Sequence, residues 1–226
     1  MNVSQSEDEF YFGFHSHTVC RPEDNMKCVR VHLLHRLIAD TILKQCRKTH
    51  LFDSLYKLRD VITEVDHIRC APYGDLELSF QIGVHTNIDD TARRSPLCYW
   101  PKFLLEMREW IHIATGHFYN MVTLTRAEDS AECYLNDVQR SKISPVCIMS
   151  LGPTRICRFE HRTNKNIKPV NIKMEHGSML VINSETINEW SRTVPKIDGI
   201  GSTSILTFMN IESPDPDIAV TRIRIQ

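Results

Sequence analysis

A run of short apolar segments between Tyr119 and Met209 constrains the fold of this chain more than any other feature. The segments are residues 121–124, 146–151, 156–159, 170–174, 179–182 and 204–208. Turn-forming sequences such as Gly152-Pro153 separate them. Short strands at such spacing, with turn residues between them, predict a sandwich or a barrel.

Upstream of the strands, apolar residues recur at helical spacing. Val31, Leu34, Leu37, Ile38 and Ile42 mark a first helix, and the pattern repeats over residues 51–65 and 103–114. The predicted fold class is therefore mainly β with flanking helices.

Composition limits the functional classes. A net charge of -1 over 226 residues gives the whole chain no general attraction to nucleic acid. Eight cysteines without a Cys-x-x-Cys pair argue against a zinc ribbon and favour a reduced, intracellular protein of the nucleus or cytoplasm. We find no signal peptide pattern and no apolar run long enough to cross a membrane, so no membrane partner is expected.

Several collinear segments carry a family resemblance. They are residues 103–108, 114–122, 150–155, 158–162, 176–181, 190–196 and 206–208. In these segments the chain resembles the AlkB-like dioxygenases, and most closely the eukaryotic homologues that repair alkylated bases. Members of that family use iron and 2-oxoglutarate to demethylate nucleic acid.

The resemblance implies a division of the chain. Residues 67–212 would form a double-stranded β-helix (jelly-roll) of the 2-oxoglutarate oxygenase type. Residues 1–30 would be an N-terminal tail and docking segment, and residues 31–66 would supply bracing helices. Residues 213–226 would be a C-terminal tail.

The resemblance also locates the metal site. The family holds iron with a His-x-Asp pair and a distant His, and the matching positions here are Tyr134, Asn136 and Arg192. Tyrosine and asparagine are poor neutral ligands for iron(II), and arginine carries a permanent positive charge that repels a dication. No His-x-Asp occurs anywhere in the chain. We therefore expect no metal and no catalytic residue.

The cosubstrate positions differ in the same way. The family grips 2-oxoglutarate with two arginines on the last core strand and with an Asn-x-Tyr pair on the first. The matching residues are Thr125, Ala127, Thr203, Ile205 and Met209. None of these side chains can form a charged fork to a carboxylate, so no cofactor is expected.

Cations gather on one predicted hairpin. Arg155, Arg158, Arg162, Lys165 and Lys168, followed by Lys173, accompany the single acid Glu160. These cations are candidate nucleic-acid contacts, because lysine and arginine neutralise phosphates. A solvated hairpin whose charges keep the protein soluble is an equal alternative.

These observations predict a catalytically inactive AlkB-like homologue, a pseudoenzyme. It would act as a binding or scaffold protein for a protein partner or for nucleic acid. One alternative is an active dioxygenase that demethylates alkylated DNA or RNA with a non-standard metal site, using Tyr134, Asp137 or Cys133. A third is a purely structural subunit of a ribonucleoprotein or repair complex.

Overall fold

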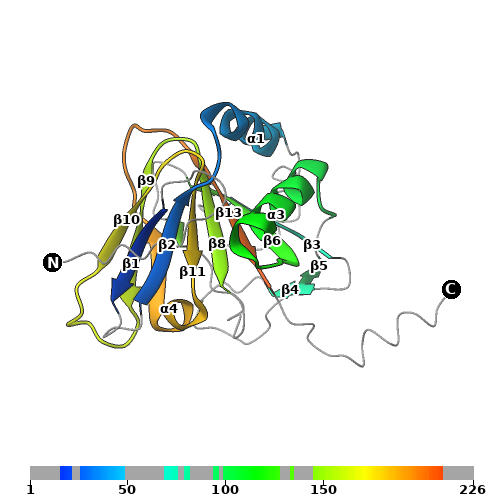
Figure 1. Cartoon of the computed structure of the whole chain (residues 1–226). Coiled ribbons are helices and arrows are strands. Elements are labelled where there is room, and N and C mark those ends of the chain that lie inside the picture. Colours follow the sequence, from blue (N-terminus) through cyan, green and yellow to red (C-terminus); the bar gives the residue numbers. More distant parts are fainter. Residues whose placement is uncertain are drawn as a thin grey trace, which may run out of the picture.

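Two antiparallel sheets pack face to face in this computed structural model (Figure 1). The structure describes residues 16–21, 26–48, 69–75, 79–81, 94–96, 99–127, 133–134 and 145–210. The predicted fold class, mainly β with flanking helices, is confirmed.

The larger sheet has seven strands in the order β1-β2-β11-β8-β13-β6-β3. Their bounds are β1 Ser16–Arg21, β2 Met26–His32, β11 Ser178–Ile182, β8 Val146–Leu151, β13 Thr203–Met209, β6 Met121–Ala127 and β3 Arg69–Gly74. β3 lies at an edge of this order, which suits Pro72 because proline cannot donate to a sheet ladder.

The smaller sheet has four strands in the order β10-β9-β12-β7. Their bounds are β10 Val170–Met174, β9 Arg155–His161, β12 Trp190–Val194 and β7 Cys133–Tyr134. A separate pair joins β4, Ser79–Gln81, to β5, Arg94–Pro96.

A hydrophobic core fills the space between the two sheets. Phe159 and Trp190 of the smaller sheet are both 0% exposed and belong to one cluster with Leu180 and Ile205 of the larger sheet. Each buried side chain of this size contributes roughly 1.5 to 3 kcal/mol to folding. The alternating burial of β10, where Asn171 and Lys173 are exposed, follows from the period of two along a strand.

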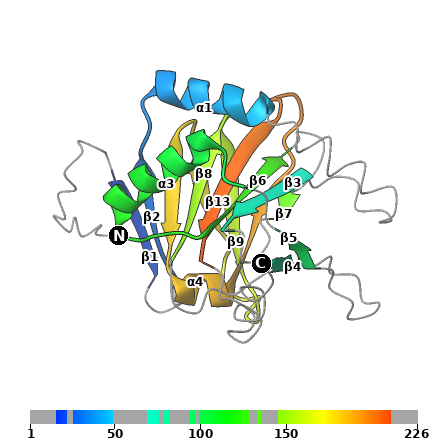
Figure 2. The same cartoon turned by 90° about the vertical axis from the view of Figure 1, so that its right-hand side faces the viewer.

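Three helices accompany the sheets within the residues that the structure describes. α1, Arg36–Lys48, and α3, Lys102–Thr115, lie over the outer face of the larger sheet (Figures 1 and 2). α4, Ser184–Glu189, lies at the other end of the barrel from α1. A second core cluster joins Ile42 of α1 and Ile111 of α3 to Leu206 on the outer face. α3 ends at Gly116, whose φ of 71° allows a left-handed cap.

The N-terminal part differs from the prediction. β1 and β2 are full members of the larger sheet, whereas the sequence predicts a tail and docking segment up to residue 30. Val31 lies in β2 rather than in a helix, and α1 begins at Arg36. The predicted helix over residues 51–65 and the C-terminal tail lie outside the described residues. In the part of the chain that the structure describes, no helix is long and apolar enough to span a membrane.

Candidate functional site

The five positions that match the 2-oxoglutarate contacts all lie on two paired strands. In the β6–β13 ladder, Ala127 is opposite Thr203 and Thr125 is opposite Ile205. All five side chains are at most 6% exposed. Ala127, Ile205 and Met209 belong to the core cluster between the sheets. The positions therefore meet inside the barrel, but they present methyl, thioether and hydroxyl groups to it.

A different arginine reaches this pair of strands. Arg155 begins β9, and its Nε donates a hydrogen bond to Thr203 Oγ1 over 3.2 Å. Its Nη2 donates to the carbonyl oxygen of Gly201 over 2.7 Å and to that of Ala127 over 3.5 Å. Thr203 Oγ1 in turn donates to the carbonyl of Pro153 over 3.0 Å. The guanidinium thus ties three separate segments together at the predicted cosubstrate positions.

This role corrects one expectation. The sequence predicts Arg155 as a nucleic-acid contact, but its side chain is 0% exposed and hydrogen-bonded within the barrel. It is not available to a phosphate on the surface. The sequence contains one signal of burial, since Arg155 lies between the Gly152-Pro153 turn and the apolar segment 156–159. Its partners, however, lie up to 48 residues away.

Arg192 lies in the middle of β12, at the position that matches the distant histidine ligand. It is opposite Phe159 in register and 3% exposed. Burial lowers the pKa of its guanidinium, and the neighbouring thiols of Cys157 and Cys28 act in the opposite direction. Arg192 also lowers the pKa of Arg162, after the larger effect of burial on Arg162 itself. A cationic group therefore occupies the barrel interior at this position.

Of the other two positions that match the iron ligands, Tyr134 lies within the described residues and Asn136 does not. Tyr134 belongs to β7 and pairs in register with Thr193, one position from Arg192. The structure thus brings the strands of Tyr134 and Arg192 side by side without placing the two residues in the same register. Asn136 and Asp137 lie outside the described residues.

The residues that the structure describes do not supply a set of donor atoms that suits iron(II). A facial site needs two imidazoles and a carboxylate around open positions. No group of three or more His, Cys, Asp or Glu that could hold a metal occurs in the part of the chain that the structure describes. The Arg192 guanidinium would repel a dication at this place.

The basic hairpin formed by β9 and β10 is partly neutralised by its own acids. Arg158 Nε lies 2.7 Å from Glu160 Oε1, and Lys173 Nζ lies 3.0 Å from Glu175 Oε1. Arg162 is of intermediate exposure, whereas Lys165 and Lys168 are exposed. The other candidate contacts apart from Arg155 therefore remain compatible with a surface role, at a lower net charge than the sequence suggests.

The reactivity of the buried cysteines tests whether the interior of the protein is closed to solvent. Burial raises the pKa of Cys46 to about 12, and it also raises the pKa of Cys28 and of Cys147. Because the thiolate is the nucleophile, a raised pKa keeps these thiols protonated and unreactive near pH 8. We expect Cys28, Cys46, Cys147 and Cys157 to resist iodoacetamide in the native protein and to react fully in denaturant. Mass spectrometry of tryptic peptides measures this, and rapid native labelling at Cys28 or Cys157 would contradict the closed interior.

Sequence comparison finds relatives in the family that the sequence resembles. DNA oxidative demethylase ALKBH2 of Bos taurus is 26% identical over 135 residues, which cover 55% of this chain and 46% of that protein. Alpha-ketoglutarate-dependent dioxygenase alkB homolog 3 of Bos taurus is 25% identical over 190 residues, which cover 79% of this chain and 63% of that protein. The chain thus spans about half to two thirds of the length of these relatives. No family model matches it.

Structural comparison agrees. A solved structure of OsALKBH1 superposes with a TM-score of 0.53 and 13% identity, covering 81% of this chain and 97% of that one. The chain is therefore similar to AlkB-like dioxygenases in sequence and in fold. The predicted AlkB-like resemblance and the jelly-roll fold are confirmed. The function of this AlkB-like chain depends on the side chains at its metal and cosubstrate positions.

Proposed function

We propose that this AlkB-like chain is a pseudoenzyme that works as a binding or scaffold protein. The observation that carries the proposal is the buried Arg192 at the position of the third iron ligand. A permanent cation inside the barrel opposes the binding of iron(II), because two positive charges in a low-dielectric interior repel each other strongly. The Arg155 hydrogen bonds at Thr203 and Ala127 support the proposal from the cosubstrate side.

The test is thermal stability with iron(II) or manganese(II), with and without 2-oxoglutarate, under anaerobic conditions. A ligand that binds only the folded state raises the unfolding free energy, by about 2.7 kcal/mol at a hundred times its Kd. We expect no shift in melting temperature for this chain under any of these conditions. Alpha-ketoglutarate-dependent dioxygenase alkB homolog 3 of Bos taurus serves as the positive control.

A stabilisation that requires both metal and 2-oxoglutarate would contradict the proposal. It would favour the alternative of a dioxygenase with a non-standard site, and demethylation of alkylated oligonucleotides would then be assayed. Arg192→His is the matched variant, because it removes the cation and supplies an imidazole at the same position. We expect it alone to leave metal binding absent, because the other donors of the site are not restored.

We favour a protein partner over nucleic acid. Of the six hairpin cations, Arg155 is buried, and Arg158 and Lys173 lie within 3.0 Å of carboxylates. Three phosphate contacts would give a salt slope of only about -3 on duplex DNA, which corresponds to weak, non-specific binding. Nucleic acid remains the second candidate partner.

A further inference from the structure

Two helices of the AlkB-like chain expose large apolar side chains on the same side of the molecule. Leu37 and Ile38 of α1 are 70% and 43% exposed, and Trp110 and Ile113 of α3 are 38% and 62% exposed. α1 already packs on the sheet with Ala39, Ile42, Leu43 and Cys46. Its second apolar stripe is therefore not needed to attach it to the barrel.

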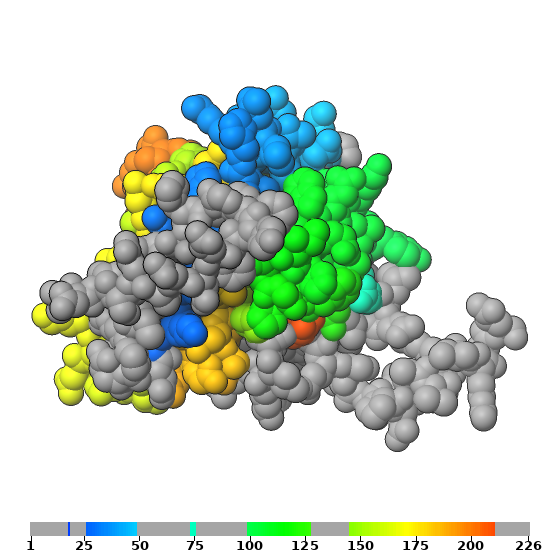
Figure 3. All heavy atoms as spheres, in the orientation of Figure 1, coloured from blue at the N-terminus to red at the C-terminus, as the bar shows by residue number. Residues whose placement is uncertain are grey.

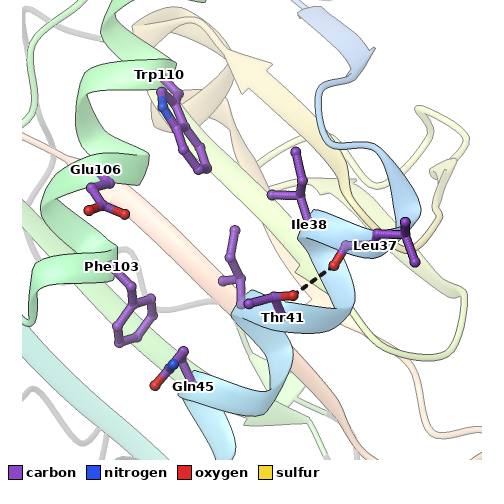
Figure 4. A pocket seen from close by; sticks show the side chains of 8 residues that line it. Leu37, Ile38, Thr41, Gln45, Phe103, Glu106 and Trp110 are labelled. Carbon is purple, nitrogen blue, oxygen red and sulfur yellow. Dashed lines mark hydrogen bonds between the residues drawn. The ribbon is translucent and has the colours of Figure 1, made fainter.

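An open groove of about 380 Å³ lies between the two helices. The side chains that line it are Leu37, Ile38, Thr41, Ile42, Gln45, Phe103, Glu106 and Trp110 (Figure 4). The surfaces of α1, in blue, and α3, in green, adjoin at the upper right of Figure 3. Because the groove is open rather than enclosed, it would leave much of a small ligand in solvent, which favours a macromolecular partner.

The groove continues into a second hollow that has a basic end. Lys48 at the last turn of α1 and Lys102 at the first turn of α3 line it, together with Gln45, Pro101, Phe103 and Glu106. Lys102 Nζ lies 3.8 Å from Glu106 Oε1, and its side chain is 91% exposed.

α1 itself is strongly basic. It carries the exposed cations Arg36, Lys44, Arg47 and Lys48 against one acid, Asp40. Asp40 Oδ1 lies 3.2 Å from His176 Nε2 of the barrel. Of the side chains that line the two hollows, Lys48 and Lys102 are cationic and Glu106 is anionic, so the basic end carries a net positive charge. Its complement is acidic.

We propose that the α1–α3 groove binds an amphipathic helix of another protein. The apolar face of that helix would cover Leu37, Ile38 and Trp110, and acidic residues near one end would meet Lys48 and Lys102. A groove between two helices with apolar anchors at helical spacing is the geometry that receives such a helix. The inference rests on the proposed binding role and names its surface and the chemistry of the partner.

Charge argues against a second copy of this chain in the groove. A symmetric contact would place the basic α1 of one protomer against that of the other, because the same patch faces itself across a two-fold axis. Like charges brought together across an interface oppose association. An acidic helix meets the opposite charge instead.

The experiment uses two synthetic peptides of about 18 residues, roughly five helical turns. Both carry the same leucine face, and the polar face is glutamate-rich in one and lysine-rich in the other. Fluorescence anisotropy with the full chain measures their Kd values. We expect the acidic peptide to bind at least about tenfold more tightly, and we expect Leu37→Ser and Trp110→Ala each to weaken it about tenfold. Tyr99→Ser is the matched control, because Tyr99 is 75% exposed and does not line the groove.

Charge reversal provides a readout that a purely structural role would not move. Lys48→Glu combined with Lys102→Glu should reverse the preference, so that the basic peptide binds more tightly. Lys165→Glu on the hairpin should change neither Kd.

Equal affinity for both peptides, absent binding, or binding that ignores the groove substitutions would overturn the groove proposal. A dimer in light scattering that dissociates in Leu37→Ser would assign the groove to a second copy and would equally overturn it. None of these outcomes bears on the metal and 2-oxoglutarate test, so the two proposals fail separately.

Discussion

Replacing Arg155 by alanine should lower the free energy of unfolding by roughly 3 to 5 kcal/mol. The substitution leaves a cavity where a fully buried guanidinium stood. It also removes the donors to Thr203 Oγ1 and to the carbonyl of Gly201, and an unsatisfied buried acceptor costs about 1 to 3 kcal/mol. Urea unfolding at neutral pH measures the change, and the melting temperature should fall on the order of 10 °C.

Arg158→Ala is the matched control on the same strand. Arg158 also forms an ion pair, at 2.7 Å to Glu160, but both side chains are 43% exposed. Exposed ion pairs contribute about 0 to 1 kcal/mol, so this variant should remain close to the parent. Similar losses for the two variants would show that the Arg155 guanidinium does not anchor the barrel.

Arg155→Lys separates charge from geometry. Lysine keeps the positive charge but places its donors on one nitrogen, whereas Arg155 uses Nε and Nη2 for different acceptors. We expect the lysine variant to recover less than half of the lost stability.

The sheet is predictable where a strand has a clear apolar pattern. β8 and β10 have the bounds that the sequence predicts, because β8 is a continuous buried run, β10 alternates buried and exposed residues, and Gly, Pro or polar residues end both. α3 is predictable for the same kind of reason, since its apolar stripe ends at Gly116. Local pattern and tertiary environment agree in these elements.

β12 and β2 are not recognisable as strands because their sequences do not look like core. β12 places Arg192 between Ser191 and Thr193, yet Arg192 is buried beside Phe159. β2 carries Lys27 and Arg30, and Val31 continues a helical spacing with Leu34. Tertiary pairing with β11 decides the conformation there over local periodicity.

The candidate site also has a part that the sequence predicts and a part that it does not. The resemblance places Thr203 and Ala127 at one site, and the ladder pairs them directly. The contacts of Arg155 depend on three segments that meet only in the folded chain. Sequence spacing carries no information about contacts between distant segments, so the hydrogen bonds of Arg155 could not be predicted.

Replacing Gly177 by alanine should cost roughly 2 to 5 kcal/mol. Gly177 has a φ of 79°, and a Cβ there would lie 2.9 Å from the carbonyl oxygen of Leu34 and 3.2 Å from Ala39 Cβ. Left-handed backbone costs an L-residue about 1 to 2 kcal/mol, and overpacking costs typically 1 to 3 kcal/mol more. The carbonyl of Gly177 also accepts a hydrogen bond from the Leu34 amide over 3.2 Å, so the turn cannot retreat without losing it.

Gly199→Ala isolates the packing contribution. Gly199 has nearly the same φ, 80°, but a Cβ at this position would meet no heavy atom within 4 Å, so only the backbone strain applies. The difference between the two variants in urea unfolding should be roughly 1 to 3 kcal/mol. Because Leu34 and Ala39 lead into α1, this difference measures how firmly the turn holds that helix against the barrel. Equal costs would mean that α1 yields to the added methyl group, and the α1–α3 groove would then lack a rigid wall.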